Sequence, residues 1–246
     1  MTLEVNDFCM NRGGLKIGPL NFKLDEGRIL SIIGKNGSGK TSSLLGIMGI
    51  IEKVSGNVNI DGIDASSMHA RDVSRKLSLV QQELPVPMSL SVHDIMDIAA
   101  YSRDASEEEM NDALETCKIS HMDKRDFATL SGGEKRMVSI ASAIYQDSRY
   151  ILMDEPASFL DIDKVHLLST ILKDLKKKGK GIICVMHDIN LAASISDQML
   201  LMKSGQVVDY GNTWDVMNVG NMGKIYDAKF RSYDSPEGVR FYPVFS

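Results

Sequence analysis

Short apolar runs and turn residues divide the chain into an alternating series of strands and helices. Four runs are short and mostly apolar, which suits strands covered on both faces: residues 28–33, 76–80, 150–153 and 181–186. Helical patterns lie over residues 42–48 and 163–178, and the second is amphipathic with a basic last turn. Strands that alternate with helices predict an α/β fold with a mostly parallel sheet.

Two regions depart from this alternation. Residues 3–24 alternate loosely and contain several turn residues, which predicts short strands and turns in an antiparallel β subdomain at the N-terminus. From Pro85 to about Arg149 the chain shows no convincing strand, and helices are predicted over residues 92–100 and 107–116. We therefore expect one domain over residues 1–246. Its core would comprise residues 1–84 and 150–246, a helical subdomain would be inserted at residues 85–149, and a hairpin would end the chain at residues 230–245.

Composition narrows the class of protein. The 246 residues include 28 Lys and Arg against 33 Asp and Glu, a net charge of −5, so we expect no nucleic-acid partner. The cysteines at positions 9, 117 and 184 are too far apart for a metal or redox motif, which favours a reducing compartment. No stretch approaches the ~20 apolar residues of a membrane span, and no signal peptide is recognisable. Any membrane link would therefore run through a partner.

A glycine-rich loop follows the first buried strand and precedes a helix. Residues 34–41 fit the phosphate-loop pattern of Gly, four residues, then Gly-Lys-Ser/Thr. Glycines allow the backbone N–H groups to surround phosphate oxygens, and the following helix adds the positive end of its dipole. Lys40 can reach the β- and γ-phosphates, and the Thr41 hydroxyl can ligate Mg²⁺. The predicted ATP contacts of this loop are Gly34, Lys35, Asn36, Gly37, Ser38, Gly39, Lys40 and Thr41.

Two carboxylates directly follow the apolar run at residues 150–153. Asp154 can hold the shell of Mg²⁺ opposite Thr41, and Glu155 can orient and deprotonate an attacking water. His187 follows the run at residues 181–186, so it is expected at the same edge of the sheet. A histidine there can bond the γ-phosphate and hold the water with Glu155. Glu155 and His187 are therefore the predicted catalytic pair.

Residues 130–134, Leu-Ser-Gly-Gly-Glu, precede another helical pattern. Ser131 can cap that helix, and Gly132 and Gly133 leave its N–H groups open to an anion. Taken alone, this segment describes an ordinary capped helix.

The order of the motifs resembles that of ATP-binding-cassette (ABC) ATPases over essentially the whole chain. The phosphate loop, Gln81, the Leu-Ser-Gly-Gly-Glu signature, Asp154-Glu155, the segment ending at Asp161 and His187 follow one another as in that family. The resemblance implies an α/β P-loop nucleotide-binding core with an inserted helical subdomain. It also implies a homodimer in which each ATP lies between the phosphate loop of one copy and Ser131, Gly132 and Gly133 of the other.

The same resemblance assigns two further residues. Gln81 would contact ATP, Mg²⁺ and the water at the hinge to the helical subdomain, and Asp161 would lie at the dimer interface. Three departures stand out. Glu134 replaces the commoner Gln, and Met137 replaces a residue that is basic in many members. No aromatic residue falls near Arg12 to stack on adenine, so the Arg12 guanidinium could stack there instead.

Within the family the chain resembles the ATP-binding subunits of importers of iron–siderophore complexes, haem or vitamin B12 (cobalamin). Residues 18–34, 81–103 and 187–211 carry this resemblance. It implies a peripheral ATPase on the cytoplasmic face of the cell membrane. Its partners would be integral membrane permease subunits, which would dock on residues 81–103, and indirectly a substrate-binding protein.

Other classes remain as alternatives. A soluble ABC ATPase of iron–sulfur cluster assembly also reads Ser-Gly-Gly-Glu-Lys, as residues 131–135 do, but residues 187–192 and the stretch after Gln81 favour an importer. A P-loop kinase would have no use for the signature segment, and a non-enzymatic binding module would lack Glu155.

Overall fold

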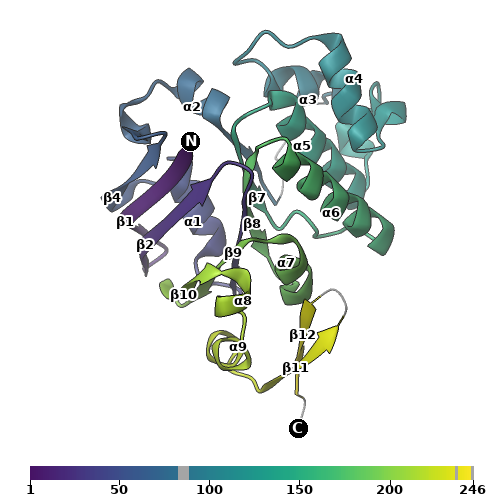
Figure 1. Ribbon diagram of the computed structural model, residues 1–246. Helices are drawn as coiled ribbons and strands as arrows, with labels where there is room; N and C mark the ends of the chain where they lie inside the picture. The colour runs from purple at the N-terminus through teal and green to yellow at the C-terminus, as the bar shows by residue number, and fades with distance from the viewer. Residues whose placement is uncertain (83–88, 236–237, 245–246) are drawn as a thin grey trace.

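A six-stranded sheet crosses the centre of the molecule in the computed structural model, which describes residues 1–82, 89–235 and 238–244 (Figure 1). Its strand order is β10-β9-β3-β8-β7-β6, and every neighbouring pair is parallel except β10 with β9. The mostly parallel sheet predicted from the sequence is thereby confirmed. The strands are β3 (Ile29–Gly34), β6 (Leu77–Val80), β7 (Tyr150–Asp154), β8 (Gly181–Met186), β9 (Gln198–Lys203) and β10 (Gln206–Asn212).

A second, antiparallel sheet is formed by the N-terminal part of the chain, as predicted. Its order is β2-β1-β4-β5, with β1 (Thr2–Arg12), β2 (Leu15–Asp25), β4 (Lys53–Ile60) and β5 (Ile63–Asp64). The first two strands are longer than the short strands expected over residues 3–24. Apolar side chains at alternate positions, such as Leu20, Phe22 and Leu24, keep one face of β2 buried to its end, so pairing continues past the turn residues.

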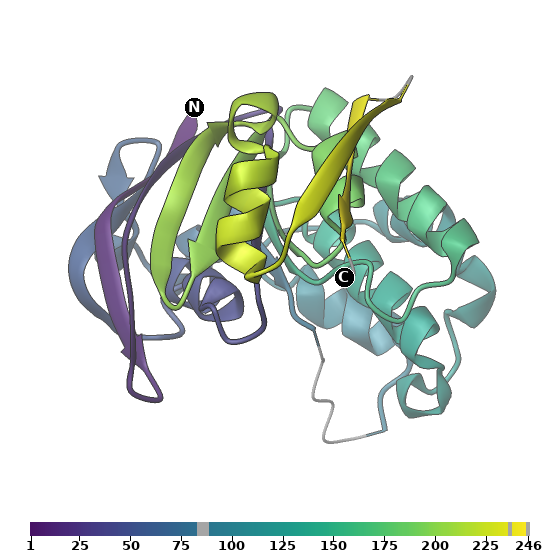
Figure 2. The same ribbon diagram turned by 90° about the horizontal axis from the view of Figure 1, so that it is seen from below.

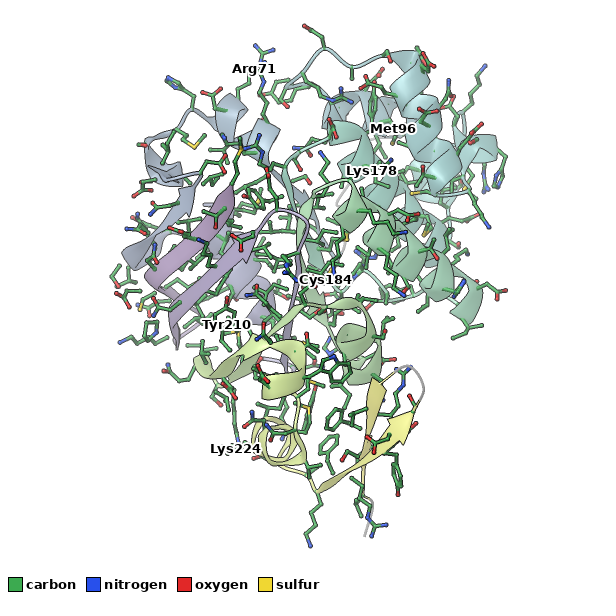
Figure 3. The ribbon with its side chains drawn as sticks, in the orientation of Figure 1. Arg71, Met96, Lys178, Cys184, Tyr210 and Lys224 are labelled. Atoms are coloured by element: carbon green, nitrogen blue, oxygen red, sulfur yellow. The ribbon has the colours of Figure 1, made fainter. Side chains whose placement is uncertain are left out.

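The central sheet separates two apolar cores, because alternate side chains of each strand point to opposite faces. On one face, Leu30 and Ile32 pack with the antiparallel sheet and with α1 (Lys40–Ile47). On the other face, Ile29 and Ile33 pack with the remaining helices. Cys184 of β8 is fully buried near the middle of the molecule (Figure 3). Burial on both faces explains why these strands are apolar runs rather than alternating patterns.

Helices occupy the stretch between β6 and β7, and no strand lies within residues 89–149. They are α3 (Val92–Ala99), α4 (Glu107–Thr116) and α5 (Gly132–Gln146), which lie together at one end of the molecule (Figure 1). The helices predicted at 92–100 and 107–116 are confirmed. Met96, part of the predicted docking segment, is buried within this group (Figure 3). Residues 83–88, which include the predicted subdomain boundary, lie outside the described residues.

The C-terminal part begins with α6 (Ile162–Lys177) and α7 (Ile189–Ile195) and ends with the predicted hairpin. The hairpin pairs β11 (Phe230–Ser235) with β12 (Gly238–Pro243) and lies beside α7 (Figure 2). Its expected last residue, 245, is outside the described residues. Four short α-helices of the described chain were not predicted, because each is too short to show a periodic pattern: α2 (Ala70–Lys76), α7, α8 (Thr213–Val216) and α9 (Val219–Tyr226). None of the described helices has the length and apolar character that crossing a membrane requires.

Tyr150, at the start of β7, provides a test of this packing. Its side chain is fully buried, and its hydroxyl has no hydrogen-bond partner in the described structure. Because an unpartnered buried hydroxyl opposes folding, Tyr150→Phe should raise the free energy of unfolding by about 1 kcal/mol. Tyr145→Phe is the matched control. It removes a bond to the Ser106 carbonyl (3.4 Å) and should cost about 0.5–1.5 kcal/mol. Chemical denaturation measures both, and equal losses would contradict the packing described here.

Candidate functional site

The phosphate loop is held between the end of β3 and the start of α1. Gly34 must be glycine, because a Cβ atom there would lie 2.2 Å from the Met202 carbonyl oxygen. Gly39, just before the helix, has φ 102°, a backbone conformation that side chains disfavour. The loop therefore folds back over the helix N-terminus. This brings the Lys40 ammonium to the carbonyl oxygens of Gly34 (2.8 Å) and Lys35 (3.0 Å).

Two side chains of the loop are buried in a way that suits an anion. Lys40 is 5% exposed, and burial lowers its pKa, an effect that the charges of Glu155 and Asp154 oppose. Ser38 is 2% exposed, and its hydroxyl has no hydrogen-bond partner in the described structure. A buried cation and an unpartnered buried donor both gain from a negatively charged ligand. The loop thus fits phosphate oxygens.

Asp154 ends β7 directly beside the start of α1. Its carboxylate accepts a hydrogen bond from the Thr41 hydroxyl at 3.1 Å. The side chain is almost fully buried, and this burial raises its pKa, although the Thr41 bond and the charges of Arg136 and Lys40 act in the opposite direction. A buried carboxylate next to a hydroxyl offers two oxygen ligands of the kind that Mg²⁺ prefers.

Glu155 gathers three polar side chains around its carboxylate. Oε2 accepts from the Gln82 amide (2.9 Å) and from the Ser158 hydroxyl (3.0 Å), and Oε1 is paired with His187 Nε2. The backbone of Glu155 has φ 50°, in the left-handed region that a non-glycine residue rarely adopts. Such strain, about 1–3 kcal/mol, persists where neighbouring structure fixes it, often at functional sites.

A groove of 510 Å³ joins these parts. The phosphate loop, Glu155 and His187 all line it, as the sequence predicted for residues at one edge of the sheet. Arg12 and Leu15, from the strands β1 and β2, also line it. The lining residues are Arg12, Leu15, Asn36, Gly37, Gly39, Lys40, Thr41, Ser42, Gln82, Glu155 and His187.

Two neighbouring glutamines follow β6 and face different parts of the site. Gln81 lines a smaller cavity with Thr41 and Asp154, whereas Gln82 lines both this cavity and the main groove. Of these two glutamines, only Gln82 forms a hydrogen bond with Glu155 in the described structure. Sequence reasoning selected Gln81 alone and missed Gln82. Two identical residues in a row give no pattern from which their directions could be predicted.

The signature segment lies apart from the phosphate groove. The Ser131 hydroxyl accepts from Glu134 N (3.3 Å), and Glu134 in turn accepts from Ser131 N (2.7 Å), so the start of α5 is capped as predicted. Ser131 and Gly132 are exposed and line other cavities. In the described part of the chain, none of residues 130–134 lines the phosphate groove. The predicted ATP contacts therefore fall into two separate groups.

Asp161 is exposed and caps α6, where its carboxylate accepts from Lys164 N at 3.0 Å. Just before it, Phe159 is 68% exposed, has φ 65° and contacts Gly132. The loop between β7 and α6 thus presents an exposed apolar ring next to the signature segment.

Arg136 was not predicted as part of the site. It is 3% exposed, and its guanidinium donates to the carbonyl oxygens of Gln81 and Gln82, both at 2.6 Å. Burial lowers its pKa, while the charges of Asp154 and Glu155 oppose the shift. The sequence did contain a signal for this burial, because Arg136 lies among the apolar positions of a predicted helix.

Comparison with known proteins supports one family. The ABC transporter family matches residues 17–158. The petrobactin import ATP-binding protein FatE of Bacillus anthracis is 28% identical, and the alignment covers 91% of this chain and 92% of that protein. The hemin import ATP-binding protein HmuV of Bordetella parapertussis is 30% identical, with 92% of each chain covered.

A solved structure gives the same result for the fold. A structure described as a metal-chelate type ABC transporter in an inward-facing conformation matches with a TM-score of 0.85 at 24% identity, covering 99% of this chain and 98% of that chain. At this identity the likeness concerns the fold alone, and the fold is the one described above.

The burial of Asp154 generates a stability prediction. A carboxylate whose pKa is raised by folding opposes folding when it is ionised, and the penalty disappears as the pH falls toward that pKa. Asp154→Asn removes the charge and keeps an oxygen that can accept from Thr41. The nucleotide-free variant should therefore melt above the wild type at pH 7, by about 2–4 °C for each 1 kcal/mol gained.

The advantage of Asp154→Asn should shrink when the melting curves are repeated at pH 5. Asp174→Asn is the control, because Asp174 is an exposed acid on α6 and should change stability by no more than about 0.5 kcal/mol. A lower melting temperature for Asp154→Asn at pH 7 would show that the charge stabilises the empty site.

Proposed function

The chain belongs to the ABC transporter family and is an ATPase, and from this premise we propose that it is the ATP-hydrolysing subunit of an importer. In this proposal two copies pair head to tail, and each ATP lies between them. The pair closes on ATP and opens after hydrolysis, and this movement drives the integral membrane permease subunits. Residues 85–149 would act as the helical signature subdomain, and residues 1–84 with 150–246 as the nucleotide-binding core.

One observation carries the proposal: each copy presents the two groups of predicted ATP contacts on different surfaces. The phosphate groove is lined by the phosphate loop with the start of α1, by Glu155 and by His187, but within the described residues it is not lined by the start of α5. The exposed, capped start of α5 offers a helix N-terminus elsewhere on the molecule. A second copy would supply it through Ser131 and Gly132, which are exposed, whereas Gly133 is buried beneath the loop that contains Phe159.

In this proposal different residues of the site bind the phosphates and the metal ion of Mg-ATP. The backbone of residues 34–41 and the Lys40 ammonium would bind the β- and γ-phosphates. Lys40 would exchange its present carbonyl partners for phosphate oxygens. Thr41, Asp154 and Gln81 would hold Mg²⁺. The hydrogen bond from Thr41 to Asp154 supports this assignment, because it brings the two side chains together. When bound, Mg²⁺ supplies positive charge to the oxygens of the transferred phosphoryl group.

Hydrolysis would depend on the carboxylate of Glu155. Glu155 would take the proton of the attacking water, and His187 and Gln82, which already contact its two oxygens, would hold the carboxylate and the water in line with the γ-phosphate. Asp161 would lie in the dimer interface, where its cap fixes the start of α6 next to the exposed Phe159.

The transported substrate would be an iron chelate or haem, with cobalamin as a third member of the same class. The similar proteins FatE and HmuV support this, since their names describe petrobactin and hemin import. The chain would then work as a peripheral protein on the cytoplasmic face of the membrane. It would be bound to the permease near residues 81–103, with a substrate-binding protein acting through that permease.

Replacing Glu155 tests the hydrolysis step. Glu155→Gln keeps the size of the side chain and one oxygen that can accept from Gln82 and Ser158, but it removes the base, so turnover should fall by about 10²–10⁴-fold. ATP binding should remain, because the phosphate loop is unchanged. The variant should therefore accumulate as an ATP-bound dimer. Phosphate release, nucleotide binding and size-exclusion chromatography with and without ATP measure the three outcomes.

Glu115→Gln is the matched control. Glu115 is an exposed acid on α4, and its replacement should leave turnover and oligomeric state as in the wild type. A Glu155→Gln protein that hydrolyses ATP at the wild-type rate, or that binds ATP and stays monomeric, would be incompatible with the proposed function.

A further inference from the structure

The helix that begins with the signature segment carries a buried cation whose role is not explained by ATP binding. Arg136 lies four positions after Gly132 and is 3% exposed. Since burial of a charge is costly unless it is fully hydrogen-bonded, its partners show what the structure gains from it. In the described structure its hydrogen bonds go to main-chain carbonyl oxygens: Gln81 O at 2.6 Å, Gln82 O at 2.6 Å and Asp154 O at 3.4 Å.

These acceptors require a guanidinium group. Nη1 and Nη2 each donate to one of two consecutive carbonyls at the end of β6, and Nη1 also approaches the end of β7. The two short distances are typical of charge-assisted bonds. A lysine carries its charge on a single nitrogen and could not reproduce the planar fork. Arg136 therefore holds a particular backbone arrangement at residues 81 and 82.

Arg136 connects helix α5, which begins with the signature segment, to residues 81 and 82 beside the phosphate groove. Four residues of helix span roughly 6 Å, so the backbone of Arg136 lies about one turn from the start of α5. At the other end of the contact, the side chain of Gln82 donates to Glu155. A rotation of α5 relative to the sheet must therefore carry residues 81 and 82 with it or break two short hydrogen bonds.

We propose that Arg136 is a positioning residue that couples the orientation of the α5 N-terminus to the contact between Gln82 and Glu155. This inference rests on the proposed function, in which that N-terminus closes over the nucleotide of a second copy. Closure of the pair would then set Gln82 and Glu155 for hydrolysis through one guanidinium. ATP binding to an unpaired copy would not require it.

Arg136→Met tests the coupling with a side chain of similar length and no charge. The Kd for ATP should stay within about twofold, since the phosphate loop does not contact Arg136. The kcat should fall by about 10²-fold, the loss expected when a reacting group is misplaced by about 1 Å. Arg136→Lys should lose most of the same activity. Titration with ATP and steady-state phosphate release at one fixed protein concentration measure these quantities.

Chemical rescue separates positioning from general stability. In Arg136→Ala, guanidinium chloride at millimolar concentration should restore part of kcat by occupying the vacated position, whereas ammonium chloride at equal ionic strength should not. Arg75→Met is the control, because Arg75 also donates to a main-chain carbonyl, Ser102 O at 2.9 Å, but on α2, away from the nucleotide groove. It should leave kcat, Kd and rescue behaviour unchanged.

The proposal is overturned if Arg136→Met or Arg136→Lys keeps kcat within twofold of the wild type. It is equally overturned if kcat and ATP affinity fall in parallel in every folded variant without guanidinium rescue, since that result describes a purely structural residue. If Arg136→Met does not fold, Arg136→Lys and the rescue experiment decide. Failure of the proposed function would show instead in the wild type, as a rate that does not depend on protein concentration.

Discussion

The phosphate loop and the start of α5 line different cavities of one chain, and this separation is the constraint on which the rest of the account depends. The loop is fixed between β3 and α1, whereas the signature segment begins a helix of the insertion between β6 and β7. Each segment has groups that suit an anion. The phosphate loop has the buried Lys40 and the unpartnered hydroxyl of Ser38, and α5 has a capped N-terminus. In one copy the two segments line different cavities, and in our proposal a head-to-tail pair would bring them together on one ATP.

Charged side chains are buried at the carboxyl edge of the central sheet, and their burial affects the electrostatics of the candidate site. Asp154 and Lys40 are almost fully buried, so burial opposes their charged forms, and a ligand of opposite charge would reduce this cost for each of them. Glu155 accepts a strained backbone conformation, and its carboxylate is oriented by Gln82, Ser158 and His187. Burial of charge and backbone strain are usual costs of a preorganised site.

The sequence predicted the parts of this arrangement that depend on local pattern. The apolar strands, the phosphate loop and the carboxylates at a strand end follow from periodicity and chemistry within a few residues, and the structure confirms the α/β fold. Gln82 and Arg136 could not be predicted in the same way. The direction of the Gln82 side chain depends on the backbone conformation just after β6. The carbonyl partners of Arg136 at Gln82 and Gln81 are 54 and 55 residues away in the chain. The long strands β1 and β2 exceeded expectation because pairing across the sheet outweighs local turn signals.

The claim that two copies complete one site is tested most directly by mixing two defective variants. Lys40→Ala should abolish the phosphate loop, and Ser131→Arg should block the start of α5, so each protein alone should be inactive. In a mixed pair one site carries both defects and the other carries none. An equimolar mixture should therefore recover up to about one quarter of the wild-type ATPase rate. A mixture that stays as inactive as its components, or a Ser131→Arg protein that is fully active alone, would contradict the account.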